Sequence, residues 1–231
     1  MSITIGIIGA LPEEIHPYRE VMTNVSSKTQ LGLEFISGGL CGHRIVAVEC
    51  GVGKTNAALG ATLLISAHGA EAIVFTGVCG GLADSLRVFD TVISECSAHH
   101  DLPVEFLTSY RPHLPGEWLP CGEALLAAAR LGVAAGDYGD SVHFGKVVTG
   151  EVFVHREGRE EIISRFNPLC VDMETASVAQ VAFVAGVPYI AVRTVSDTED
   201  GSGIDAFRLN CGLAAEKSFD VVCAMLRSLE A

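Results

Sequence analysis

The sequence predicts an α/β protein in which helices cover a central sheet. Short runs rich in Val and Ile alternate with Ala- and Leu-rich stretches, and 49% of the 231 residues are hydrophobic whereas 19% are charged. This composition provides enough apolar material for a sizeable core and argues against disorder. Strands that alternate with helices along the chain are typical of a sheet flanked by helices.

The expected strands are short apolar runs bounded by glycine, proline or polar residues. They are Ile3–Ile8, Leu33–Ser37, Arg44–Glu49, Ala72–Thr76, Val88–Glu95, Val142–Thr149, Leu169–Val171 and Tyr189–Val195.

The expected helices are longer stretches with helical periodicity or a high alanine content. They are Glu13–Val21, Lys54–Ala67, Gly122–Leu131, Arg159–Arg165, Thr175–Ala185 and an amphipathic C-terminal helix covering much of Asp205–Leu229. The Pro- and His-containing segment 101–120 is expected to be a long loop, a kind of segment that often carries function. No linker or repeat interrupts the pattern, so we expect one domain over residues 1–231.

Charge and composition narrow the class of partner. A net charge of −13 without a Lys/Arg cluster argues against nucleic acid. No apolar run approaches the roughly 20 residues that span a bilayer, and no basic segment precedes the first apolar run, so we expect a cytoplasmic protein. The eight cysteines are irregularly spaced without a Cys-x-x-Cys pair, which favours buried thiols in a reducing compartment. A small-molecule ligand is the better expectation.

Residues 49–56, Glu-Cys-Gly-Val-Gly-Lys-Thr-Asn, contain the end of a nucleotide-triphosphate loop motif. Such a loop needs a glycine at each end, and the position of the first glycine is held by Val48. A β-branched residue suits a strand better than a phosphate-binding bend. The segment is therefore expected to be a tight strand-to-helix turn rather than a triphosphate-binding loop. An ATPase remains a third rival, and ATP hydrolysis that is lost on changing Lys54 would identify it.

Glycines or carboxylates occur where four expected strands end. The segments are Gly9-Ala-Leu-Pro-Glu-Glu14, Gly77-Val-Cys-Gly-Gly81, Val171-Asp-Met-Glu174 and Arg193-Thr-Val-Ser-Asp197. Ligands bind at the carboxyl ends of strands in open α/β sheets. The four segments therefore predict one shared site.

Each carboxylate in these segments also has a plain structural explanation. Glu13 and Glu14 suit the first turn of a helix after Pro12, and because they are adjacent, at most one is expected to face a pocket. Asp172 and Glu174 share a face if the chain is extended, but Asp172 could instead cap a helix and leave Glu174 solvated. Asp197 could be a simple turn residue.

Two further clusters superficially suggest metals. Residues 197–201, Asp-Thr-Glu-Asp-Gly, do not have the ligand spacing of an EF-hand. His99-His100-Asp101 has no partner motif, and adjacent histidines rarely reach one ion, so a loop or pocket-rim role is expected.

Taken together, the chain resembles the nucleoside phosphorylase/nucleosidase superfamily, most closely its 5′-methylthioadenosine/S-adenosylhomocysteine nucleosidases. The matching segments occur in the family's order over almost the full length, and their combination is far more specific than any one of them. They are residues 5–14 (IGIIGALPEE), 51–54 (GVGK), 76–82 (TGVCGGL), 149–153 (TGEVF), 171–176 (VDMETA) and 192–197 (VRTVSD).

The resemblance implies a mixed, twisted central sheet flanked by helices and hydrolysis of the bond between adenine and ribose, without metal or cofactor. By resemblance Asp197 is the general acid at adenine N7, oriented by Ser196, and Glu14 activates the water. Glu174 would hold the ribose hydroxyls, with Arg193 positioning the water or Glu174. An aspartic acid can keep its proton near neutral pH when burial penalises the charged form.

The resemblance also implies the residues that shape the pocket. Phe153 would stack on adenine and the backbone of Val154 would read its edge, whereas Met173 would pack beneath the ribose. Core packing is the alternative for Phe153 and Met173. Leu11, Val52, Val78 and Phe207 are expected to complete the pocket, the loop 98–118 helping to enclose the 5′ group.

Water rather than phosphate is the expected nucleophile. Relatives that use phosphate place arginines around it, but here Val74-Phe-Thr76 and Pro12-Glu13-Glu14 flank the spot. A glutamate repels a phosphate dianion. A phosphorylase remains the first rival, and a nucleoside-binding protein without turnover remains a second, disfavoured because Glu14, Glu174 and Asp197 are all present.

The sequence departs from the family's pattern at two places. Val78-Cys79 stand where the closest relatives often have smaller residues, and the loop 98–118 does not align cleanly. The 5′ substituent therefore stays open between methylthio, homocysteinyl and a futalosine-like group. In the family this loop reaches the neighbouring subunit's pocket, which implies a homodimer.

Overall fold

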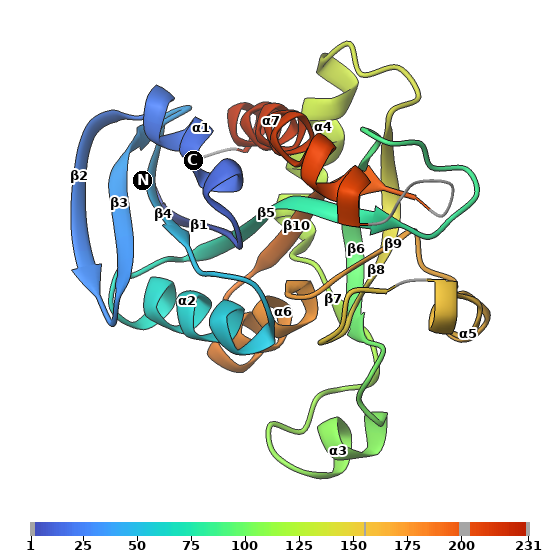
Figure 1. Ribbon diagram of the computed structural model, residues 1–231. Coiled ribbons are helices and arrows are strands. Elements are labelled where there is room, and N and C mark those ends of the chain that lie inside the picture. Colours follow the sequence, from blue (N-terminus) through green and yellow to red (C-terminus); the bar gives the residue numbers. More distant parts are fainter. Residues whose placement is uncertain (1–2, 155, 199–203, 230–231) are drawn as a thin grey trace.

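In the part of the chain that the structure describes, ten strands form one mixed sheet, and helices cover both of its faces (Figure 1). The computed structural model describes residues 3–154, 156–198 and 204–229. The strands are β1 (Thr4–Gly9), β2 (Thr23–Gln30), β3 (Leu33–Leu40), β4 (His43–Glu49), β5 (Ala72–Gly81), β6 (Thr91–His99), β7 (Leu119–Pro120), β8 (Val142–Thr149), β9 (Cys170–Asp172) and β10 (Tyr189–Asp197). The helices are α1 (Pro12–Val21), α2 (Lys54–Ser66), α3 (Val104–Ser109), α4 (Glu123–Ala135), α5 (Arg156–Phe166), α6 (Thr175–Ala185) and α7 (Ile204–Ser228). The expected fold class, an α/β domain with a mixed sheet, is confirmed.

The strand order explains how distant segments meet. Strands β4, β1, β5 and β10 are mutually parallel neighbours, so their carboxyl ends share one edge. Strand β9 runs antiparallel to β5 at Gly80–Gly81 and parallel to β8. Because β8 also pairs with β6, and β6 with β10, the strands β5, β9, β8, β6 and β10 form a closed circuit.

The apolar runs of the sequence become the core of this sheet. Ile5, Ile7 and Ile8 of β1 are fully buried, as are Ile190 and Val192 of β10. Strands buried on both faces are continuous apolar runs rather than alternating ones. Helices α1, α4 and α7 pack together over one face, and α2 and α6 pack on the other (Figure 1).

Several differences from the sequence predictions concern strand ends. β5 continues to Gly81 rather than ending at Thr76, and β10 continues to Asp197, because the two strands pair with each other over this length. Asp197 is thus a strand residue, not a turn residue. β6 begins at Thr91 rather than Val88 and continues to His99, since it is paired with β8 over that length.

Three elements were missed in segments without apolar periodicity. β2 is almost entirely exposed and is held as an edge strand by antiparallel pairing with β3. The expected loop 101–120 contains the short helix α3 and the two-residue strand β7, which pairs with β6 at Cys96 and Ser97. In the described part of the chain, no helix is long and apolar enough to span a membrane.

The contact between α4 and α7 gives a stability prediction. A methyl group on Gly132 would lie 2.6 Å from the backbone carbon and oxygen of Ala224 in α7. Gly132→Ala is therefore expected to lower the free energy of unfolding by about 1–3 kcal/mol, the usual cost of overpacking. Urea denaturation measures this change.

Gly212, in α7, provides the matched control. Nothing lies within 4 Å of a methyl group added there, so Gly212→Ala should leave stability unchanged or raise it by up to about 1 kcal/mol through helix propensity. Equal effects of the two substitutions would contradict the close packing of α4 on α7.

Candidate active site

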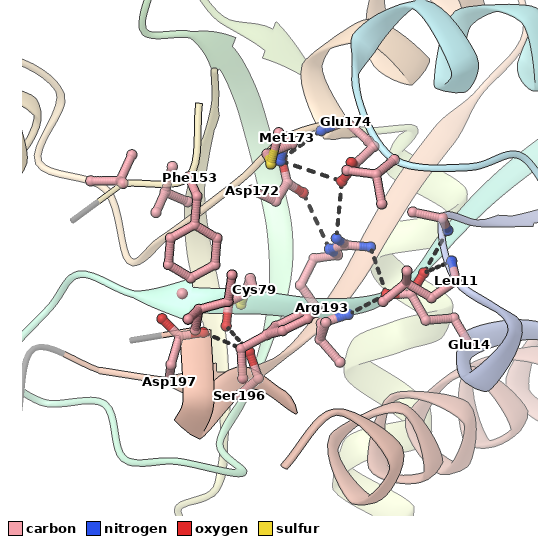
Figure 2. Close-up of a pocket in the computed structure, with 18 of the residues that line it drawn as sticks. Leu11, Glu14, Cys79, Phe153, Asp172, Met173, Glu174, Arg193, Ser196 and Asp197 are labelled. Carbon is pink, nitrogen blue, oxygen red and sulfur yellow. Dashed lines mark hydrogen bonds and ion pairs between the residues drawn. The ribbon is translucent and has the colours of Figure 1, made fainter. Parts of the chain in front are cut away.

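A cavity lies at the sheet edge where the carboxyl ends of β1, β5 and β10 meet β9 (Figure 2). Residues from the four segments that the sequence singled out line it, together with residues near β8 and at the start of α7. All twelve residues expected to form the site are on its wall: Leu11, Glu14, Val52, Val78, Phe153, Val154, Met173, Glu174, Arg193, Ser196, Asp197 and Phe207.

Arg193, on β10, lies at the centre of a buried charge cluster (Figure 2). Its side chain is 2% exposed and lies 3.2 Å from Asp172, 3.5 Å from Glu174 and 3.9 Å from Glu14, measured between charged atoms. Its Nε faces Asp172 as an ion pair without hydrogen-bond geometry, whereas Nη1 donates to the carbonyl of Thr76. Burial alone would lower the pKa of Arg193, but the three carboxylates outweigh it and raise the pKa. The guanidinium therefore stays charged.

Glu14 is held by backbone amides in the first turn of α1. Its carboxylate accepts hydrogen bonds from the N–H groups of Ala10 (2.5 Å), Leu11 (3.0 Å) and Val78 (2.8 Å). Burial raises its pKa, while Arg193 and these amides oppose the rise. The neighbouring Glu13 is exposed, so one member of the acidic pair faces the cavity.

The approach of Glu14 to β5 requires glycine at position 77. Gly77 has φ +136°, and a Cβ there would lie 1.9 Å from Glu14 Oε1. Any side chain at this position would displace the carboxylate from the Val78 amide. The Gly77 of the sequence motif is thus explained by close approach rather than by a turn.

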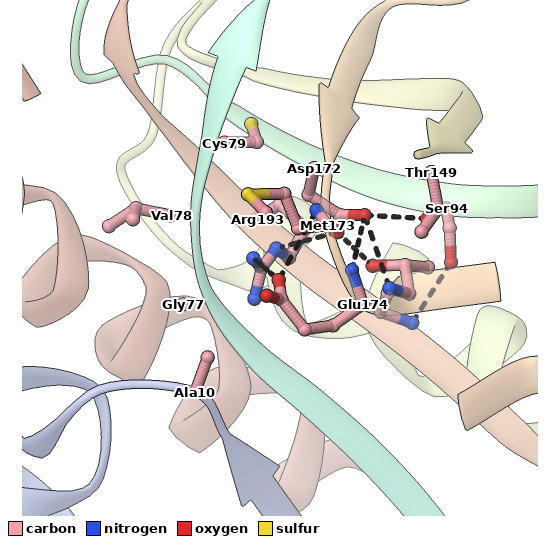
Figure 3. Close-up of polar contacts among 12 residues, drawn as sticks. Ala10, Gly77, Val78, Cys79, Ser94, Thr149, Asp172, Met173, Glu174 and Arg193 are labelled. Carbon is pink, nitrogen blue, oxygen red and sulfur yellow. Dashed lines mark hydrogen bonds and ion pairs between the residues drawn. The ribbon is translucent and has the colours of Figure 1, made fainter. Parts of the chain in front are cut away.

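Asp172 and Glu174 both point toward Arg193, from the junction of β9 and α6 (Figure 3). Asp172 Oδ1 accepts the amides of Glu174 (3.2 Å) and Thr175 (3.1 Å) and the hydroxyl of Thr149 (2.6 Å). Asp172 therefore caps α6 and also contacts Arg193. The capping alternative required Glu174 to be solvated, but Glu174 is only 3% exposed.

The environment of Glu174 shifts its pKa strongly. Burial, followed by the negative charge of Asp172, raises the pKa of Glu174 to about 7, although Arg193 and the Gly53 amide act in the opposite direction. The Gly53 N–H donates to Oε1 at 2.8 Å. The glycine turn between β4 and α2 thus reaches a cavity carboxylate through its backbone.

Ser196 and Asp197 form the other end of the cavity (Figure 2). Ser196 Oγ lies 2.7 Å from Asp197 Oδ1 and 3.2 Å from the carbonyl of Cys79, and Asp197 is 7% exposed. Phe153 extends toward this end, and its ring meets Phe207 edge-on with centroids 6.2 Å apart. This end combines a buried carboxyl group with aromatic walls.

Lys54 does not fit the role of a phosphate-binding lysine. It is absent from the described cavity wall, and its ammonium pairs with Asp101 Oδ1 at 2.5 Å. His99, beside this pair, is buried and contacts Gln180. Among the described residues, no three His, Cys, Asp or Glu side chains are placed to hold a metal ion.

The predicted site residues did not include every residue of the cavity wall. Ala10, Cys79, Gly80, Val152, Val171, Asp172 and Ile204 also line the cavity. The alternating spacing of Asp172 and Glu174 could have indicated that Asp172 also faces the cavity. No feature of the sequence indicated that Val152 and Ile204 line it. No residue of 98–118, a segment that is fully described, lines this cavity within the chain, so the expected role of the loop around the 5′ group stays a prediction about the partner subunit's pocket.

Comparisons with known proteins agree with this geometry. A profile of the phosphorylase superfamily matches residues 4–227. The 5′-methylthioadenosine/S-adenosylhomocysteine nucleosidase of Listeria innocua is 33% identical over 235 residues, covering 98% of this chain and 100% of that protein.

Solved structures share the fold over the full length. The S-adenosylhomocysteine nucleosidase of Streptococcus pyogenes in complex with 5-methylthiotubericidin has a TM-score of 0.91 at 26% identity, covering 100% of this chain and 98% of that chain. The futalosine hydrolase of Helicobacter pylori has a TM-score of 0.90 at 28% identity and covers 99% of each chain. The motifs, the fold and these relatives agree, and the chain belongs to the phosphorylase superfamily and, within it, to the 5′-methylthioadenosine/S-adenosylhomocysteine nucleosidase family.

Proposed function

We propose that the protein hydrolyses the N-glycosidic bond of 5′-modified adenosines, 5′-methylthioadenosine or S-adenosylhomocysteine, to adenine and the ribose derivative. The observation that carries this proposal is that Glu14, Glu174 and Asp197, far apart in the sequence, line one cavity. Relatives of the same family bear the name of this activity.

Asp197 acts as the general acid in this proposal. Adenine is a poor leaving group until N7 is protonated, and Asp197 is nearly buried beside Ser196, whose Oγ lies 2.7 Å from Oδ1. A positioned acid that gives its proton in the transition state contributes about 10²–10⁴-fold to the rate. Phe153 stacks on the adenine and the Val154 backbone contacts its edge.

The ribose occupies the end of the cavity with the charge cluster. As the bond to adenine breaks, the sugar becomes cation-like, and carboxylates stabilise that state more than the neutral substrate. Glu174 accepts hydrogen bonds from the ribose hydroxyls, and Met173 packs beneath the ring. Arg193 holds Glu174 and Glu14 in position through the ion pairs described above.

Glu14 activates the attacking water. Its burial raises its pKa, which makes the carboxylate a better proton acceptor than a solvated glutamate. The backbone donors Ala10, Leu11 and Val78 fix its orientation.

The charges around the ribose end favour water over phosphate. The described wall carries one cation, Arg193, against the carboxylates Glu14, Asp172, Glu174 and Asp197. Arg193 is already surrounded by three of these carboxylates, so it is not available to a phosphate dianion. This electrostatic balance supports a hydrolase rather than a phosphorylase.

The 5′ group contacts apolar side chains in this proposal. Leu11, Val52, Val78 and Phe207 offer an apolar surface suited to a thioether. A futalosine hydrolase is nevertheless among the similar structures, with a TM-score of 0.90, and makes futalosine the second candidate substrate.

We also propose that the protein acts in the cytoplasm as a homodimer. Helix α3 projects from the body of the molecule, and Phe106 and Tyr110 are 60% and 65% exposed there (Figure 1). Exposed apolar rings on a projecting segment are typical of a protein–protein contact. The loop 98–118 would then contribute to the partner's pocket.

The proposed reaction gives a prediction about the nucleophile and the substrate. In phosphate-free buffer the protein is expected to release adenine from methylthioadenosine or S-adenosylhomocysteine, because water is the nucleophile. Base release from these two compounds, adenosine, inosine and futalosine, measured by chromatography, identifies the substrate. A strict requirement for phosphate, with ribose 1-phosphate products, would assign a phosphorylase instead.

Asp197→Asn is expected to lower kcat at least about 100-fold, because it removes the transferable proton while keeping the shape. Binding of a non-hydrolysable adenosine analogue, measured by calorimetry, should change little. Wild-type activity in this variant would contradict the assignment of the acid.

Glu14→Gln should likewise lower kcat at least about 100-fold, since an amide cannot accept the proton of water. Glu13→Gln is the matched control, because Glu13 is adjacent but exposed, and its activity should equal that of the wild type. Steady-state adenine release distinguishes the two, and similar losses in both would argue against a specific role of Glu14.

The pH profile should report Glu174, whose pKa is raised to about 7. Below this pH the group is protonated and accepts ribose hydrogen bonds poorly, so kcat/KM should rise as the pH increases through about 7. Glu174→Gln should lower kcat/KM and remove this inflection. An unchanged inflection in that variant would assign it to another group.

A further inference from the structure

We propose that Lys54 and Asp101 are a positioning pair that fastens two segments of the cavity wall to each other. Neither residue lines the cavity in the described chain. The pair joins the glycine turn before α2 to the segment 150–154, which carries Phe153 and Val154. This inference rests on the proposed nucleosidase function.

The Lys54 side of the pair controls a hydrogen bond to the ribose end. Lys54 directly follows Gly53, whose N–H donates to Glu174 at 2.8 Å. Gly53 has φ +97°, a conformation that favours glycine, and Asn56 Nδ2 holds the turn from the α2 side by donating to the carbonyl of Val52 at 2.7 Å. The ion pair of Lys54 adds a second anchor, which ties the turn to Asp101 outside α2.

Asp101 connects the pair to segment 150–154, at the end of the cavity proposed to bind adenine. While Oδ1 accepts Lys54 Nζ at 2.5 Å, Oδ2 accepts the N–H of Glu151 at 2.8 Å. Glu151 lies two residues before Phe153, and its Oε1 is 3.3 Å from where a Cβ on Gly53 would be. One carboxylate thus bridges the two segments, which also touch each other.

The location of Lys54 supports a role beyond the helix it begins. A cation in the first turn of a helix opposes the helix dipole, and no acidic residue occupies the first turn of α2. Asp101 supplies the missing negative charge. Burial acts to raise the pKa of Asp101, but the hydrogen bonds from Lys54 and Glu151 outweigh burial and lower it, so the carboxylate is charged.

The pair also differs from an ordinary surface ion pair. Lys54 and Asp101 side chains are 15% and 29% exposed, whereas those of Arg130 and Glu95 are 50% and 43% exposed at the same 2.5 Å separation. Exposed pairs contribute little. Because the pair is partly shielded from water and Asp101 also accepts the Glu151 amide, it can hold the two segments of the cavity wall together.

Loss of the pair is expected to weaken substrate binding more than chemistry. In the proposed function, segment 150–154 contacts adenine in the ground state and the transition state alike, which is uniform binding. The glycine turn acts only through Glu174, which keeps its ion pair with Arg193 when the turn loosens. Lys54→Met and Asp101→Asn should each raise KM for methylthioadenosine about 5- to 30-fold and leave kcat within about twofold.

A double-mutant cycle tests whether the two residues act together. The KM of the Lys54→Met/Asp101→Asn double variant should exceed that of the single variants by no more than about twofold, because the second substitution removes no further interaction. Lys54→Arg should restore most of the affinity. Glu95→Gln, which breaks the exposed pair with Arg130, is the matched control and should have wild-type kinetics.

Hydrogen–deuterium exchange of the ligand-free proteins provides a readout independent of turnover. In Lys54→Met, the amides of residues 51–56 and 150–154 should exchange at least about threefold faster, with unchanged exchange in β1 and an unchanged melting temperature. A general loss of stability would accelerate exchange everywhere. If Lys54→Met does not fold, Asp101→Asn permits the same comparison, because it removes the same ion pair.

Unchanged KM in both single variants, additive losses in the double variant, or unchanged local exchange would each overturn the proposal. If the wild type releases no base from any nucleoside, the proposed function fails. Hydrogen–deuterium exchange of segments 51–56 and 150–154 in Lys54→Met then tests the positioning role independently of activity. Faster local exchange supports this role, and unchanged exchange refutes it.

Discussion

The buried guanidinium of Arg193 is the interaction on which the rest of the site depends. Three carboxylates lie within 4 Å of it, and each is almost completely shielded from water. Without a cation among them, burying these acids together would carry a large desolvation and repulsion penalty. Arg193 also donates a hydrogen bond to the carbonyl of Thr76, and its guanidinium carbon lies over the ring of Phe75, 4.2 Å from the centroid. The cluster therefore exists only because all of its members are folded around one cation.

The sheet explains why these groups meet. Parallel pairing places the ends of β1, β5 and β10 at one edge, and the closed circuit through β9 and β8 brings Asp172 and Glu174 against them. Close approach of the chain is possible because Gly77 lacks a side chain where Glu14 passes. Backbone amides of Val78 and Gly53 then orient Glu14 and Glu174, respectively.

The two ends of the cavity have different chemical characters that suit the proposed reaction. The end with Glu14, Glu174 and Arg193 is rich in charge and stabilises a developing cation. The end with Asp197, Ser196 and Phe153 offers a shielded carboxyl group and an aromatic surface. Outside the cavity, the ion pair of Lys54 and Asp101 links the walls of both ends, so positioning and chemistry are divided between different residues.

The sequence by itself determined the α/β class, most of the strands and helices and the family, because these depend on local periodicity and on motifs that stay in order. The ends of β5 and β10, the edge strand β2 and helix α3 depended on tertiary structure, since pairing partners rather than local composition hold them. The dual contact of Asp172 and the pairing of Lys54 with Asp101 are also tertiary. Charges 47 residues apart in the chain become neighbours only when the sheet brings their loops together.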